Sequence, residues 1–109
     1  RVIEGLAEKI QRLTAQLDNQ MKHLRHVADI RQRGLMVGIE LARDPATRAA
    51  YEADERVGAR VTVAARAHNV IVRPLGDVIV LMPPLSIRLS EIDSLVSAVR
   101  QAIVSVTET

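Results

Sequence analysis

The apolar residues of this 109-residue chain change their spacing along the sequence, and that change restricts the fold more than any other feature. In the first segment they recur at steps of three and four, the period of one helix face, and in the segment from Leu35 to Leu41 they recur at every second position, as in a half-buried strand. The helical stripe consists of Ile3, Leu6, Ile10, Leu13, Leu17, Met21 and Leu24. This stripe also fits a short coiled-coil seam, but so few heptads favour a helix that packs on its own domain.

The strand from Leu35 to Leu41 forms a predicted hairpin with a shorter strand from Val27 to Arg31. Gln32-Arg33-Gly34 lies between them, and Gly34 can adopt the positive φ that a tight turn needs. A glycine inside a strand, here Gly38, marks a bulge or the close approach of another backbone. Asp44-Pro45 ends this strand and begins a polar loop that continues to about Tyr51.

A second helix is predicted from Glu55 to His68, with Asp54 as its N-cap and Asn69 as its left-handed stop. Two β-branched runs then flank the sequence Pro74-Leu75-Gly76-Asp77, which is typical of a second hairpin. This hairpin runs from Val70 to Met82, and Pro83-Pro84 ends it.

The last helix is predicted to begin at Ser90, with Asp93 three residues later in the spacing of a capping box. Its buried face is predicted to contain Ile92, Leu95, Val96, Val99, Ala102 and Ile103. The element order is therefore α-β-β-α-β-β-α, which predicts an α+β two-layer domain with its helices on one face of a mostly antiparallel sheet. A chain of this length favours one hydrophobic core.

The composition excludes several classes of function. The chain has 15 Lys and Arg against 13 Asp and Glu, and a net charge of +2 is too small to indicate binding to nucleic acid or to an anionic membrane. Tyr51 is the only aromatic residue, so stacking on bases is nearly excluded. The absence of cysteine excludes disulfides, thiolate metal sites and cysteine nucleophiles. No apolar stretch is long enough for a membrane span.

Arg73 is the residue that points most clearly to a binding function. It lies inside the second β-branched run, directly before a proline that holds it extended. An arginine in such a setting needs a partner, and its planar guanidinium suits a carboxylate or a phosphate. An internal ion pair with Glu40, or a side chain reaching out of an edge strand, would also satisfy it.

The other polar residues with possible chemistry give weaker signals. His23 and His26 lie three apart and could share a helix face, but no third metal ligand of suitable type lies near them in the sequence. His68 is better explained by packing or capping, and neither Ser86 nor Ser90 has the context of a nucleophile elbow. Lys9 and Lys22 lie on the solvent side of the first helix, where a Schiff-base lysine is not expected. The sequence therefore contains no complete catalytic constellation.

Two segments resemble the class III aminotransferases, which use pyridoxal phosphate (PLP). The first runs from Arg31 to Leu41 as RQRGLMVGIEL and continues as RDPATR from Arg43 to Arg48. The second, IVRPLGDVIVLMPPL from Ile71 to Leu85, is more specific. It is similar to the members that aminate 8-amino-7-oxononanoate in biotin synthesis, with S-adenosylmethionine as the amino donor. The resemblance covers essentially all of the chain but only about the last quarter of such an enzyme.

The resemblance implies a fold-type-I enzyme of the α/β class, made of a large cofactor domain and a small domain and working as a homodimer. This chain would supply a leading helix, 1–25, and the C-terminal small domain, 26–109. The arginine that matches Arg73 holds the carboxylate of the oxo-acid substrate in this family. The Schiff-base lysine, the aspartate that pairs with the pyridine nitrogen and the phosphate-binding residues would lie upstream. No catalytic, cofactor-binding or metal residue is therefore assigned in this chain.

Several expectations follow from the resemblance. We expect a cytoplasmic protein whose partners are the rest of the aminotransferase chain, a second subunit and a small oxo acid, with no nucleic acid and no membrane. The isolated chain is expected neither to bind PLP tightly nor to transaminate. It is expected to self-associate through its exposed apolar surfaces. Two alternatives stay open: another class III transaminase acting on an ω-amino acid, and a free-standing α+β module for dimerisation or regulation.

Overall fold

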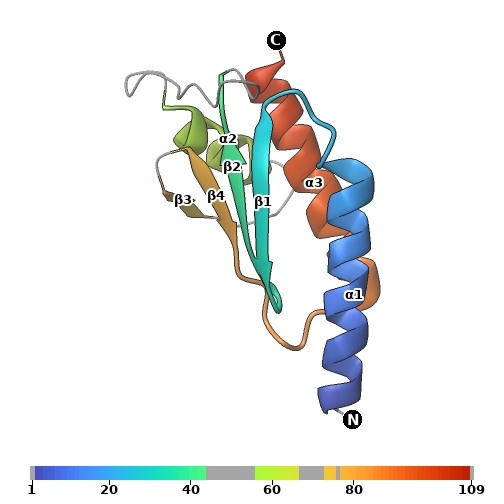
Figure 1. Cartoon of the computed structure of the whole chain (residues 1–109). Coiled ribbons are helices and arrows are strands. Elements are labelled where there is room, and N and C mark those ends of the chain that lie inside the picture. The colour runs from blue at the N-terminus through green and yellow to red at the C-terminus, as the bar shows by residue number, and fades with distance from the viewer. Residues whose placement is uncertain (1, 44–55, 67–72, 76, 109) are drawn as a thin grey trace.

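The computed structural model describes residues 2–43, 56–66, 73–75 and 77–108 of the chain. Its elements, shown in Figure 1, are α1 (Val2–Gln20), β1 (Val27–Arg33), β2 (Met36–Leu41), α2 (Val57–Arg66), β3 (Arg73–Leu75), β4 (Val78–Leu81) and α3 (Leu89–Thr107). The order α-β-β-α-β-β-α confirms the predicted fold class of a small α+β domain.

The four strands form one antiparallel sheet in the order β1-β2-β4-β3, and the three helices lie together on one of its faces (Figure 1). We call the helix-covered side the inner face of the sheet and the opposite side its outer face. The core lies between the inner face and the helices, and its fully buried members include Leu13, Met21, Val37, Ile39, Ile79, Leu81, Ile92, Val96, Val99 and Ile103. In the part of the chain that the structure describes, no helix has the length and hydropathy that a bilayer span requires.

Helix α1 packs on its own domain, as its apolar stripe predicts. Leu13, Leu17 and Met21 are at most 2% exposed, so the stripe is used by the chain's own core and not by a coiled-coil partner. The helix ends earlier than the stripe does. Met21 and Leu24 lie in the turn that follows Gln20, where the Met21 N–H still donates to the Leu17 carbonyl at 3.0 Å.

The first hairpin confirms the predicted role of Gly34 and corrects that of Gly38. Arg33 pairs with Met36 across a two-residue turn in which Gly34 has a φ of +61°, the left-handed region that favours glycine. The ladder is irregular between Val27 and Asp29, whereas Gly38 pairs in regular register with both neighbouring strands. Of the two roles predicted for Gly38, the bulge is therefore wrong, and the close approach of another backbone stays a prediction.

The second hairpin turns later than predicted, and the predicted strand residues Val70–Val72 lie outside the described residues. Arg73, Pro74 and Leu75 form β3, so the prediction that Pro74 and Leu75 belong to the turn is wrong; Asp77 does lie in a turn. Because β3 is an edge strand, a proline without an N–H is tolerated in it. The Asp77 carbonyl accepts the N–H of Leu41 at 2.8 Å and so ties this turn to the end of β2.

Helix α3 begins one residue earlier than predicted and uses a different cap. Its N-cap is Arg88, whose N–H donates to the Glu91 carboxylate at 2.8 Å. The capping box predicted for Ser90 and Asp93 is wrong, because Asp93 is engaged by α1 instead. The predicted buried face is confirmed, with Leu95 partly buried at its margin.

Helix α2 lies inside the range predicted for it. Its described part, Val57–Arg66, buries Val57, Val61 and Ala65 against the core. The predicted cap Asp54, the predicted stop Asn69, His68 and the loop from Asp44 to Tyr51 lie outside the described residues.

Polar contacts hold α1 to the rest of the domain along its length. Arg12 donates twice to the Asp93 carboxylate, with Nε–Oδ1 at 2.8 Å and Nη2–Oδ2 at 2.6 Å. Lys9 Nζ donates to the Leu85 carbonyl at 2.7 Å, and Arg100 Nε donates to the Gln20 carbonyl at 3.1 Å at the end of α1. The hydrogen bonds from Arg12 hold the pKa of the Asp93 carboxyl below its usual range.

Candidate functional site

The outer face of the sheet contains the positions that the sequence analysis associates with binding. Residues paired across neighbouring strands lie on the same face, so the register defines rows that cross the sheet. One row consists of Arg73 in β3, Val80 in β4, Gly38 in β2 and Arg31 in β1. The next row consists of Leu75, Val78, Glu40 and Asp29.

Arg73 is the first residue of β3, at the edge of the sheet, and pairs with Val80. Its side chain lies outside the described part of the structure, so its role as a carboxylate ligand stays a prediction. The alternative partner, Glu40, lies on the same face in the neighbouring row, with β4 between the two strands that carry them. The backbone therefore permits either role for Arg73.

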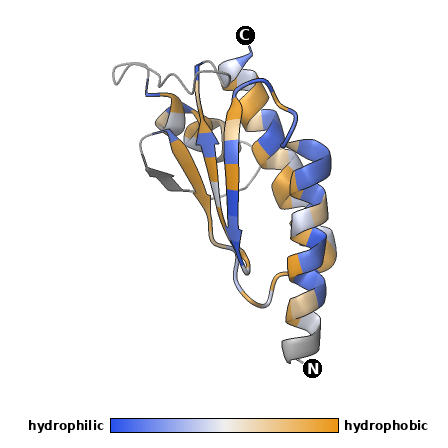
Figure 2. Cartoon of the chain, in the orientation of Figure 1, coloured by the Kyte–Doolittle hydropathy of each residue, from blue (hydrophilic) through white to orange (hydrophobic). Residues whose placement is uncertain are grey.

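The centre of the outer face is apolar and its β1 edge is charged. Val78 and Val80 are partly exposed there, and Figure 2 shows β4 as a largely hydrophobic strand. At the β1 edge, Asp29 Oδ1 accepts the N–H of Ile30 at 2.9 Å and Asp29 Oδ2 accepts Arg31 Nε at 3.1 Å. These contacts occupy the carboxylate of Asp29 within its own strand.

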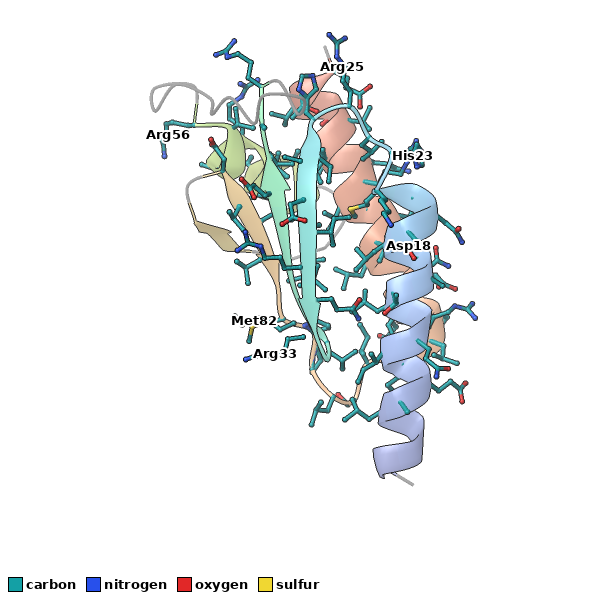
Figure 3. All side chains as sticks on the ribbon, viewed as in Figure 1. Asp18, His23, Arg25, Arg33, Arg56 and Met82 are labelled. Atoms are coloured by element: carbon teal, nitrogen blue, oxygen red, sulfur yellow. The ribbon has the colours of Figure 1, made fainter. Side chains whose placement is uncertain are left out.

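Two methionines enlarge the apolar surface at one end of the outer face. Met36 at the start of β2 is 52% exposed, and Met82, directly after β4, is 53% exposed. Figure 3 shows Met82 at this end of the sheet, near Arg33. Leu85 in the following turn is also exposed. This surface is open to contact by another polypeptide or by a ligand.

The two lysines of the chain do not provide a site for PLP. Lys9 contacts the Leu85 carbonyl at the surface of α1, and Lys22 is exposed just after that helix. A lysine that forms a Schiff base needs a desolvated setting, and neither position offers one. Neither lysine therefore fits the role of the residue that holds this cofactor.

The two nearby histidines are not arranged as metal ligands. His23 and His26 follow α1 rather than sharing a helix face, and His26 Nδ1 lies 3.0 Å from the Ala42 carbonyl oxygen. Among residues 2–43, 56–66, 73–75 and 77–108, no group of three or more possible metal ligands comes together. Ser86 lies in a turn and Ser90 within α3.

Two hollows lined by described residues lie away from β3. A cavity of about 350 Å³ lies between α1 and β1, at the opposite edge of the sheet, with Asp18, Lys22 and Asp29 among its lining residues. A second, more open and more polar hollow lies between α1 and α3. Neither includes a residue of β3 or β4, so neither continues the site predicted around Arg73.

The outer-face valines were not singled out from the sequence as part of a functional surface. The signal was present, because Val78-Ile79-Val80-Leu81 is apolar at every position instead of alternating with polar residues. A continuous apolar run is typical of a strand that is covered on both faces. The register then adds Gly38 and Glu40 to the same surface, which no spacing within the sequence could do.

The chain is similar to a known family over most of its length. The family model for class-III aminotransferases matches residues 1–103. An adenosylmethionine-8-amino-7-oxononanoate aminotransferase from Nitratidesulfovibrio vulgaris is 55% identical over 108 residues, which cover 99% of this chain and 20% of that protein.

Solved structures agree with this similarity. The crystal structure of an adenosylmethionine-8-amino-7-oxononanoate aminotransferase from Methanocaldococcus jannaschii superposes with a TM-score of 0.90 at 41% identity, covering 95% of this chain and 24% of that one. An omega transaminase from Pseudomonas jessenii, solved in complex with PMP, has a TM-score of 0.88 at 29% identity over 98% of this chain. The chain therefore spans about a fifth to a quarter of the length of the relatives it matches.

Proposed function

The chain belongs to the class-III aminotransferases, and on that premise we propose that it is the substrate-binding small domain of a PLP-dependent enzyme. The enzyme transfers an amino group from S-adenosylmethionine to 8-amino-7-oxononanoate and gives 7,8-diaminononanoate. Within that enzyme, residues 1–25, which contain α1, lead into the C-terminal small domain at residues 26–109. The 55% identity to an adenosylmethionine-8-amino-7-oxononanoate aminotransferase over 99% of this chain carries the proposal.

The chemistry of the transfer belongs to the part of the enzyme outside this chain. When bound, PLP would supply the electron sink for the transfer, and a lysine of the larger domain would hold it, since neither Lys9 nor Lys22 lies in a suitable setting. We place the full-length enzyme in the cytoplasm as a homodimer. This chain contributes binding and orientation.

Arg73 is the residue through which this chain binds substrate. Its guanidinium donates two parallel hydrogen bonds to the carboxylate of the oxo acid, at the end remote from the reacting carbonyl. Holding that end fixes the orientation of the other end before reaction, which lowers the entropic part of the barrier. The edge position of β3 supports this role, because no further strand of the described sheet lies on that side of Arg73.

A chimeric enzyme tests the proposal. In it, this chain replaces the matching fifth of the Nitratidesulfovibrio vulgaris relative. Arg73→Ala removes a charge-assisted contact of about 1.5–3 kcal/mol, so the KM for the oxo acid should rise by about 10- to 150-fold. The KM for S-adenosylmethionine should stay unchanged. Arg73→Lys should recover only part of the loss, because an ammonium cannot reproduce the bidentate geometry.

Arg60→Ala, at an exposed position of α2 in the helix layer, is the matched control and should leave both constants unchanged. An unchanged KM for the oxo acid in Arg73→Ala would reject the assignment of Arg73. If the parent chimera acts on an ω-amino acid instead, its substrate is better predicted by the structural similarity to the omega transaminases than by the sequence identity.

A further inference from the structure

Strand β4 is apolar on both of its faces, although the helices cover only one of them. Ile79 and Leu81 point inward and are at most 1% exposed. Val78 and Val80 alternate with them on the outer face, and Met82 continues that side after the strand ends. A strand with one face in water normally alternates apolar and polar residues, so β4 has the composition of a strand covered on both sides.

Gly38 lies in the middle of the same face, and the described structure does not require a glycine there. Its φ is outside the left-handed region, unlike that of Gly34. A Cβ atom at this position would meet only Val78 Cγ1 at 3.6 Å, an ordinary van der Waals distance. Glycine weakens a strand by its backbone freedom and its missing side chain. The described contacts therefore give no reason for a glycine at this position.

Apolar side chains that are partly or strongly exposed surround Gly38 along β2 and β4. Val80 pairs with Gly38, and the exposed Met36 lies two residues before Gly38 on the same side of β2. The inner face of the sheet is already filled by α1, α2 and α3. The chain also spans only about a fifth to a quarter of its relatives, so most of such a polypeptide is available to cover this face.

We propose that, in the full-length enzyme, an apolar segment of the remaining polypeptide covers the outer face, and that its main chain crosses directly over Gly38. This inference rests on the proposed function only for the existence of that remaining polypeptide. The cover would exclude water from the row that contains Arg73. A guanidinium–carboxylate contact is stronger in such surroundings than in open solvent.

Photocrosslinking in the chimeric enzyme identifies what covers the face. p-Benzoylphenylalanine replaces Met36 on the outer face or, as a control, Val63, which is 63% exposed on α2 in the helix layer. Position 36 should crosslink within one polypeptide to an apolar segment outside this chain, identified by mass spectrometry, and position 63 should not. A crosslink from position 36 to the second subunit, or no crosslink, would overturn the proposal.

Substitution of Gly38 gives an independent test. In the 109-residue chain alone, Gly38→Ala should leave the Tm unchanged or raise it by a few degrees, since a Cβ fits. In the chimeric enzyme, Gly38→Val should lower the Tm by several degrees, because the added methyl groups meet the covering main chain. Gly5→Ala, at another glycine with space for a Cβ, should not lower the Tm of either protein.

A chimeric enzyme that tolerates Gly38→Val without loss of Tm would contradict the close approach over Gly38, as would a lower Tm for Gly38→Ala in the chain alone. Neither the crosslink nor the Tm depends on which oxo acid the enzyme accepts. A wrong substrate assignment would therefore change the kinetic results while leaving these two readouts intact.

Discussion

Alternate residues of β2 lie within the same six positions and yet have opposite surroundings. Val37 and Ile39 are fully buried against the helices, whereas Met36 is 52% exposed and Gly38 is partly exposed. The inner face is complete within this chain and accounts for its stability. The centre of the outer face is apolar and is not covered by the described helices, as in a surface that is completed by contact with something else. We therefore assign stability to one side of the sheet and propose the functional surface on the other.

The largest expected difference between the faces comes from matched valine truncations. Val37→Ala removes two buried methyl groups and leaves a cavity, so the free energy of unfolding of the 109-residue chain should fall by about 2–3 kcal/mol. Val80→Ala on the outer face, where the side chain is partly exposed, should cost less than about 1 kcal/mol. Denaturant unfolding measures both, and equal losses would remove the distinction between the faces.

The two glycines of the β1–β2 hairpin, Gly34 and Gly38, should respond differently to alanine. Gly38→Ala should leave the stability of the chain unchanged or raise it, whereas Gly34→Ala should lower it. Gly34→Ala should lower the free energy of unfolding by about 1–2 kcal/mol, because an L-residue is strained at a φ of +61°. A Cβ at Gly34 has no atom within 4 Å, so the loss comes from the backbone and not from a clash. Gly34→Asn should cost less, since asparagine tolerates this conformation. Equal unfolding free energies for Gly34→Ala and Gly34→Asn would contradict a backbone origin.

The smallest expected effect concerns the ion pair between Arg12 and Asp93, which attaches α1 to α3. Unlike the apolar core, this pair contributes a stability that depends on pH. The pKa of Asp93 is lowered chiefly by hydrogen bonds from Arg12. The ion pair therefore contributes its full stabilisation at pH values above the ordinary aspartate pKa of about 3.9. This contribution is lost as the pH falls through the lower pKa that Asp93 has in the folded chain. Asp93→Asn should lower the Tm by no more than a few degrees at pH 7, because the pair is partly exposed.

Thermal melts between pH 7 and pH 2 check this prediction. The difference in Tm between the parent chain and Asp93→Asn should shrink at the acid end of that range, when the parent's carboxyl is protonated as well. Asp18→Asn, at an exposed position of α1, is the matched control. A difference that stays constant down to pH 2 would show that Asp93 acts by something other than its charge.

Much of this fold could be predicted from the sequence because its signals are local. The stripe of α1, the alternation in β2 and the glycine of the first turn each depend on residues within a few positions of one another. The bounds of β3 could not be predicted, because Pro74 is acceptable in a strand only at a sheet edge, and the position of a strand in its sheet is a tertiary property. The predicted cap of α3 was wrong for a related reason. Asp93 has a competing partner, Arg12, that lies 81 positions away.

The candidate site could likewise be predicted only in part. Arg73 stands out locally, as a charge inside an apolar run before a proline. Its place in one row with Val80 and Gly38 depends on strand order and register, which connect segments more than thirty positions apart. Arg73 can therefore be proposed as a substrate ligand from the sequence alone, whereas the surface to which it belongs cannot be predicted from it.

A thermodynamic cycle in the chimeric enzyme tests the central claim most directly. It compares the parent with Arg73→Ala, each with 8-amino-7-oxononanoate and with an analogue that has a methyl group in place of the carboxylate. If Arg73 binds that carboxylate, the two changes should be coupled by about 1.5–3 kcal/mol, so that the analogue binds both proteins almost equally. Additive losses of affinity would mean that Arg73 acts elsewhere, and would contradict the account.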